Sequence, residues 1–219
     1  RHLVKAGKPK QLALYRAIDS LVFVSETARR EFLKGAFPAE GINMDVIHNA
    51  LPQSDFPQAD TSHQPPLILY IGRLAAEKGA DVLLDLFRRL DADLPGRMDL
   101  WRPGNVPYAE FCRLLDQADI VVDQLYSYTP ATTALLAMAR GAVAVTGGED
   151  EFYRFIGEGE RRPIFNPDPC DPEGTYSRLR ELLDSPEALR RMSEDAPGFV
   201  RSHNSGDVVA ARFERFWTR

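Results

Sequence analysis

The stretch LILYIGRLAAEKGADVLLDLF, residues 67–87, indicates how this chain folds. It opens with an apolar run typical of a buried β-strand, and from residue 79 to residue 90 apolar side chains recur at helical spacing. A strand that leads directly into an amphipathic helix is the repeating unit of parallel α/β sheets. Two cations, Arg73 and Lys78, lie at the junction between this strand and this helix.

The same alternation of apolar runs and helical patterns continues along the chain. Short apolar runs predict strands at residues 20–25, 44–52, 67–72, 98–101, 119–125 and 142–147. Helical patterns predict helices at residues 25–35, 79–90, 108–118, 130–140, 173–184, 186–194 and 206–217. Continuous apolar strands between helices predict a doubly wound α/β domain, whose parallel sheet is covered on both faces. Residues 53–66 are polar and rich in proline, which makes them the best candidate for a linker.

Composition narrows the classes of function. The chain has 219 residues, of which 44% are hydrophobic and 27% charged, as in an ordinary globular protein. The net charge of -5 argues against a nucleic-acid partner, because nucleic-acid affinity comes largely from Lys and Arg on phosphates. Two distant cysteines, Cys112 and Cys170, indicate a reducing compartment, and we expect a cytoplasmic protein. The four histidines have no metal-ligand spacing, so no metal site is expected.

The first candidate site is the junction that carries Arg73 and Lys78. In open α/β sheets, ligands bind outside the carboxyl ends of the strands. A guanidinium can bind phosphate oxygens with two hydrogen bonds, and an ammonium adds a compact positive charge. The alternative is that both side chains are solvated loop cations beside acidic neighbours such as Glu77.

The second candidate site is the segment SYTPATTALLAMARG, residues 127–141. Thr129 is expected as the N-cap of a helix and Pro130 as its first residue. Thr132 and Thr133 add hydroxyl groups to the first turn, where free N–H groups and the helix dipole favour an anion. The alternative is a well-capped structural helix that binds no ligand. Two such junctions on one sheet edge favour a ligand with a diphosphate.

These segments resemble retaining GT-B glycosyltransferases of family 4, also called glycosyl transferases group 1. LILYIGRLAAEKGADVLLDLF resembles their strand–GR–x4–KG–helix signature, and ADIVVDQL with ALLAMARGAVAVTG resembles their donor-domain strand and the helix that follows. The likeness covers most of residues 19–217. It implies a partial N-terminal GT-B segment, a linker, a nucleotide-sugar donor-binding domain and a C-terminal helix, at residues 1–55, 56–66, 67–200 and 201–219.

The resemblance also implies roles for individual residues. Arg73 and Lys78 would be catalytic, because they would neutralise the donor diphosphate and stabilise the leaving nucleotide. The donor-binding residues would be Gly72, Tyr128, Thr129, Thr132 and Thr133. The co-substrate would be a UDP- or GDP-linked sugar, with no cofactor and no metal. The transfer would go to a glycan or lipid-linked acceptor, as in polysaccharide biosynthesis. Peripheral membrane association, or an N-terminal domain beyond the present chain, is a further expectation.

Two positions depart from the family pattern. The family has two glutamates eight positions apart, and the matching residues here are Tyr128 and Leu136. The second glutamate normally accepts hydrogen bonds from the nucleotide ribose, which leucine cannot do. A second hypothesis is therefore a non-catalytic GT-B-like domain that binds nucleotide-sugars or acts as a partner subunit.

Overall fold

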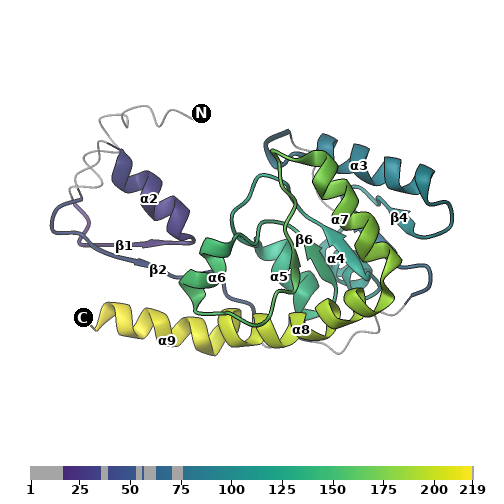
Figure 1. Cartoon of the computed structure of the whole chain (residues 1–219). Helices are drawn as coiled ribbons and strands as arrows, with labels where there is room; N and C mark the ends of the chain where they lie inside the picture. Colours follow the sequence, from purple (N-terminus) through teal and green to yellow (C-terminus); the bar gives the residue numbers. More distant parts are fainter. Residues whose placement is uncertain (1–16, 36–38, 53–55, 57–62, 71–75, 219) are drawn as a thin grey trace. The chain divides into compact units, whose positions relative to one another are not determined.

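The computed structural model describes residues 17–35, 39–52, 56, 63–70 and 76–218 (Figure 1). These residues group into two compact units, one from Arg1–Ala50 with Asp207–Arg219 and the other from Leu51–Gly206. The functional division expected at residues 1–55, 56–66, 67–200 and 201–219 stays a prediction.

The larger unit is built on a five-stranded parallel sheet with the strand order β4-β3-β5-β6-β7. The strands are β3 (Leu67–Tyr70), β4 (Asp99–Trp101), β5 (Ile120–Val122), β6 (Val143–Val145) and β7 (Ile164–Phe165). The helices are η2 (Ala76–Lys78), α3 (Ala80–Asp93), α4 (Tyr108–Leu115), α5 (Thr132–Ala139), α6 (Asp150–Ile156), α7 (Pro172–Asp184) and α8 (Pro186–Asn204).

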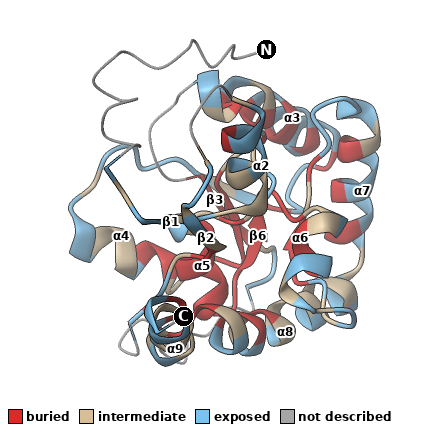
Figure 2. Ribbon diagram, turned by 90° about the vertical axis from the view of Figure 1, so that its left-hand side faces the viewer, coloured by how far each residue is buried: buried red, intermediate tan, exposed pale blue. Residues whose placement is uncertain are grey.

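Helices cover both faces of this sheet, as Figure 2 shows by the buried colour of the strands between them. Successive side chains of a strand point to opposite faces. Ile68 and Tyr70 therefore join one hydrophobic cluster with α3 and α7, whereas Leu69 joins another with α5 and α8. The predicted doubly wound α/β fold is confirmed.

The smaller unit contains two parallel strands, β1 (Ser20–Phe23) and β2 (Asn43–Val46), joined through helix α2 (Glu26–Lys34). Ser25 begins α2 as its N-cap, as expected, because its hydroxyl accepts a hydrogen bond from the Ala28 N–H at 3.1 Å. Helix α9 (Gly206–Trp217) belongs mostly to this unit and buries Val209 and Phe216 against Ile47.

Some element boundaries differ from the sequence expectation. The strand expected at 44–52 ends at Val46, and the helix expected at 186–194 continues to Asn204 through Pro197. A proline inside a helix removes one backbone hydrogen bond. Here Phe199 and Val200 are fully buried beyond it, so packing keeps the helix intact. Strand β7 and helix α6 were not expected, because each is too short to show a period.

The segment after α6 is held by a carboxylate. Glu158 accepts hydrogen bonds from the Arg161 backbone N–H at 3.2 Å and from the Arg161 guanidinium, whose Nη2 lies 2.6 Å away. Burial alone would raise the pKa of Glu158. The hydrogen bonds outweigh it, and the pKa falls from 4.5 to about 2.

This lowered pKa gives the first prediction, on acid stability. A carboxylate with a depressed folded-state pKa stabilises the fold above its unfolded value, and that stability is lost as the pH falls from about 4.5 toward about 2. The variant Glu158→Gln lacks the charge at every pH. Urea unfolding of both proteins should show a difference at pH 7 that shrinks steadily below pH 4.5. A difference that stays constant down to pH 2.5 would contradict this role of Glu158.

Candidate functional site

The strand order places a topological switch point between two strands of the larger unit. The chain passes from β3 outward to β4 and then returns to β5 on the other side of β3. The connections after β3 and β5 therefore leave the sheet in opposite directions, and ligands of open α/β sheets bind at such a point. Lys78 follows β3, and Asp123 directly follows β5.

Lys78 and Asp123 form an ion pair at this switch point. The Lys78 Nζ lies 3.4 Å from Asp123 Oδ1, although the two residues are 45 positions apart in the sequence. The Asp123 side chain is only 1% exposed, whereas that of Lys78 is 35% exposed. The ammonium is thus tied to a buried carboxylate and still reaches solvent at the carboxyl edge of the sheet.

Burial controls the ionisation of Asp123. Removal from water raises the pKa of the Asp123 carboxyl above its ordinary value, and the nearby Lys78 ammonium opposes that rise. Asp123 was not among the site residues predicted from the sequence. It could have been found there, because a carboxylate directly after the apolar run IVV (120–122) is an unusual residue at the end of a buried strand.

The backbone fixes the position of Lys78. Its carbonyl accepts a hydrogen bond from the Leu125 N–H at 2.8 Å, which ties η2 to the loop between β5 and α5. The next residue, Gly79, has φ +66° and is the N-cap of α3. A Cβ on Gly79 would lie 2.7 Å from Leu125 Cβ and 3.1 Å from the Tyr126 ring. The close approach of the two segments therefore requires glycine at this position.

The loop between β5 and α5, which follows Asp123, carries exposed aromatic side chains. Tyr126 and Tyr128 are both more than half exposed. The Tyr128 carbonyl accepts a hydrogen bond from the Glu149 N–H at 3.4 Å, and the Ser127 hydroxyl donates to the Thr129 carbonyl. The loop is therefore fastened to the start of α6 while its two aromatic rings stay accessible.

Helix α5 begins later than expected. Its N-cap is Ala131, which makes no side-chain cap, so the expected N-cap role of Thr129 is wrong. The two residues before this N-cap, Thr129 and Pro130, belong to the preceding loop. Thr132 and Thr133 form the first turn as expected, with Thr132 exposed and Thr133 half-buried. The N–H groups of this turn and the helix dipole still favour an anion.

Other residues of the sequence hypothesis fall elsewhere. Gly72 and Arg73 lie outside the described residues, so their predicted roles stay predictions. Leu136 is 4% exposed and belongs to the hydrophobic cluster on the α5 and α8 face of the sheet. The position that resembles the second family glutamate is therefore an apolar core position in this chain.

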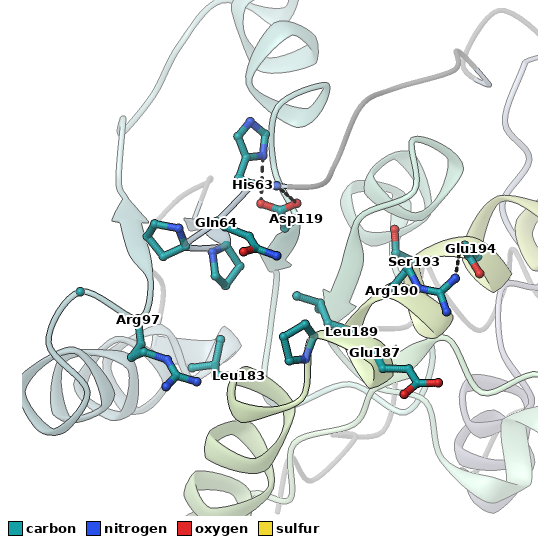
Figure 3. A pocket seen from close by; sticks show the side chains of 14 residues that line it. His63, Gln64, Arg97, Asp119, Leu183, Glu187, Leu189, Arg190, Ser193 and Glu194 are labelled. Atoms are coloured by element: carbon teal, nitrogen blue, oxygen red, sulfur yellow. Dashed lines mark hydrogen bonds and ion pairs between the residues drawn. The ribbon is translucent and has the colours of Figure 1, made fainter.

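A pocket of about 900 Å³ lies at the opposite, amino edge of the sheet (Figure 3). Asp119, which precedes β5, accepts hydrogen bonds there from the Leu67 N–H at 2.7 Å and the His63 N–H at 3.2 Å, and its other contact is with His63 Nδ1 at 3.0 Å. The pocket's arginines are paired, Arg97 with Asp184 and Arg190 with Glu194. The hydrogen bonds of Asp119 secure the entry to β3. The lining carries three carboxylates, Asp119, Glu187 and Glu194, against these two arginines, so it does not favour a phosphate or another anionic ligand.

Comparison with solved structures finds proteins of similar fold. No family model matches this sequence, and no curated protein matches it. Among solved structures, TarM from S. aureus, in complex with UDP, covers 100% of this chain at a TM-score of 0.73 and 12% identity. HepE from Anabaena, in complex with UDP and glucose, covers 99% at a TM-score of 0.68 and 12% identity. Sucrose-phosphate synthase from Thermosynechococcus elongatus covers 100% at a TM-score of 0.68 and 15% identity.

The likeness covers only part of the length of each of these neighbours. The chain spans 49% of the TarM chain, 70% of the HepE chain and 63% of the sucrose-phosphate synthase chain. The fold is that of GT-B glycosyltransferase domains. Among the described residues, none of the helices is long and apolar enough to cross a bilayer.

Proposed function

We propose that this chain is the nucleotide-sugar donor-binding domain of a retaining glycosyltransferase of family 4. The single observation that carries the proposal is the Lys78 ammonium, held at the topological switch point by buried Asp123 and open to solvent. A cation fixed there neutralises the donor diphosphate and favours departure of the nucleotide as the glycosidic bond breaks. Arg73 would add a second cation, and Thr132 and Thr133 the N-terminal turn of a helix.

The proposed co-substrate is a UDP- or GDP-linked hexose, and the proposed acceptor a glycan or lipid-linked sugar. TarM and HepE were both solved with UDP, which supports a uracil nucleotide as the first probe. No resident metal is needed, because side chains and a helix terminus supply the positive charge. Both cysteines are free, which supports a cytoplasmic setting. An acceptor domain beyond the present chain and peripheral contact with a membrane belong to the same proposal.

A second candidate function has its own observation. Neither Leu136 nor Tyr128 has a carboxylate that could accept a hydrogen bond from a ribose or a sugar. Leu136 is also buried in the core, whereas Tyr128 is exposed. A domain that binds nucleotide-sugars without transferring them would fit these two residues. Transfer assays with the intact gene product, UDP-glucose and mixed glycan acceptors would separate the two functions, because only an enzyme forms product.

Calorimetric titration with UDP, GDP and their sugars tests the donor site. We expect binding to the wild-type chain, and at least a tenfold loss of affinity in the double variant Arg73→Ala with Lys78→Ala. Tenfold corresponds to about 1.4 kcal/mol, which is modest for removal of charged hydrogen bonds to phosphate. Lys34→Ala is the matched control, since Lys34 is an exposed lysine that forms an ion pair with Glu31, far from Lys78 in the sequence. Absence of nucleotide binding by the wild-type chain would contradict the proposal.

A further inference from the structure

The burial of the Asp123 carboxylate costs folding free energy. Its side chain is 1% exposed, and a buried carboxylate is stable only when it is paired and hydrogen-bonded. Among the described residues, its ion pair is with Lys78, and its second oxygen, Oδ2, has no hydrogen-bond partner by geometry. Within the described part of the chain, the positive charge that stabilises this carboxylate is therefore the Lys78 ammonium, which is itself one-third exposed.

The described groups around this carboxylate come from three elements. Lys78 reaches it from η2 and carries the positive charge. The negative charge of Asp123 adds to burial in raising the pKa of the Tyr70 phenol, at the end of β3. The uncharged Thr146 hydroxyl, after β6, favours the ionised form of Asp123 and so lowers its pKa. Tyr70 is neutral at physiological pH, so it supplies no compensating charge. Among these described groups, Lys78 is therefore the cation that keeps Asp123 ionised.

A diphosphate ligand changes this balance. Phosphate oxygens would compete with Asp123 for the Lys78 ammonium and would bring negative charge close to it. A buried carboxylate that loses its ion pair is destabilised and favours its neutral form. The free protein already has the pKa of Asp123 raised by burial, and the bound ligand raises it further.

We propose that Asp123 is the positioning residue of the donor site, which aims Lys78 in the free protein and takes up a proton when a diphosphate engages that ammonium. The proton passes from solvent to the Asp123 carboxylate and leaves a neutral acid; no bond of the ligand is made or broken. This inference rests on the proposed nucleotide-sugar site. It makes ligand affinity rise as the pH falls between the free and bound pKa values of Asp123.

The test uses UDP-glucose, whose two phosphates are both esterified and do not titrate near neutral pH. Calorimetric titrations in buffers with different ionisation enthalpies give the number of protons exchanged on binding. For the wild-type chain, titrated at a series of pH values from 7 downward, we expect uptake of a fraction of one proton that is largest between the free and bound pKa values of Asp123. For Asp123→Asn, which preserves the shape and cannot take up that proton, we expect binding with uptake reduced at least fivefold.

A matched control separates this role from a structural one. Asp119 is also a buried aspartate, at the opposite end of β5, and Asp119→Asn should keep the proton uptake of the wild type. Equal uptake by the wild type and Asp123→Asn would overturn the inference. Should Asp123→Asn fail to fold, the wild-type titrations still decide, because binding without proton uptake also overturns it and leaves the donor site intact. Absence of any UDP-glucose binding would overturn the proposed function and this inference together.

Discussion

Gly147→Ala is expected to lower the free energy of unfolding by about 3 kcal/mol or more, the upper part of the range for single substitutions. A Cβ on Gly147 would lie 2.0 Å from the Ser127 carbonyl oxygen, 2.3 Å from its carbonyl carbon and 2.8 Å from the Tyr128 nitrogen. All three are backbone atoms, which cannot move aside as the end of a flexible side chain can. The loop after β5 must shift as a whole to admit one methyl group.

The same shift should weaken ligand binding. The displaced loop carries Tyr126 and Tyr128, and its Leu125 N–H holds the Lys78 carbonyl at 2.8 Å. We therefore expect Gly147→Ala to bind UDP at least tenfold more weakly under conditions where it remains folded. Gly159→Ala is the control, because a Cβ at Gly159 meets nothing within 4 Å. Urea unfolding and calorimetry measure the two effects; a Gly147→Ala protein as stable as the control would show that the loop tolerates the shift.

The sequence predicts the sheet well because its strands are buried on both faces. Runs such as LIL (67–69) and IVV (120–122) are apolar at every position, and such runs between amphipathic helices have few other solutions than a parallel sheet. The junction with Lys78 was also selected from the sequence as a candidate site, because ligand sites of this architecture lie at the carboxyl ends of the strands. Its role in binding a donor stays a prediction. Local patterns alone are sufficient for both expectations.

Other features depend on contacts between distant residues. The pairing of Lys78 with Asp123 requires the strand order β4-β3-β5, which no local pattern encodes. Helix α5 begins at Thr132 after an uncapped Ala131, against capping preference, while the Thr129 carbonyl accepts a loop hydrogen bond from the Ser127 hydroxyl. Thr129 was therefore wrongly expected to be the N-cap. Helix α8 passes through Pro197 because buried Phe199 stabilises the turn beyond it, a tertiary effect that overrides propensity.

Gly79→Ala is expected to cost about 2–4 kcal/mol of unfolding free energy, through two separable causes. The residue has φ +66°, where a side chain costs about 1 kcal/mol. The new Cβ would also lie 2.7 Å from Leu125 Cβ, an atom fixed to the backbone, which adds about 1–3 kcal/mol of overpacking.

The control Gly104→Ala isolates the first cause, because Gly104 has φ +77° and a Cβ there meets nothing within 4 Å. The difference between the two variants in urea unfolding therefore measures the contact between η2 and the loop after β5. Relief of that contact must move Lys78, the residue before Gly79, away from Asp123, so Gly79→Ala should also weaken UDP binding while Gly104→Ala leaves it unchanged. The two variants could instead lose the same amount of unfolding free energy and both keep the wild-type affinity for UDP. That result would mean that the approach of Gly79 to Leu125 does not position the Lys78 ammonium.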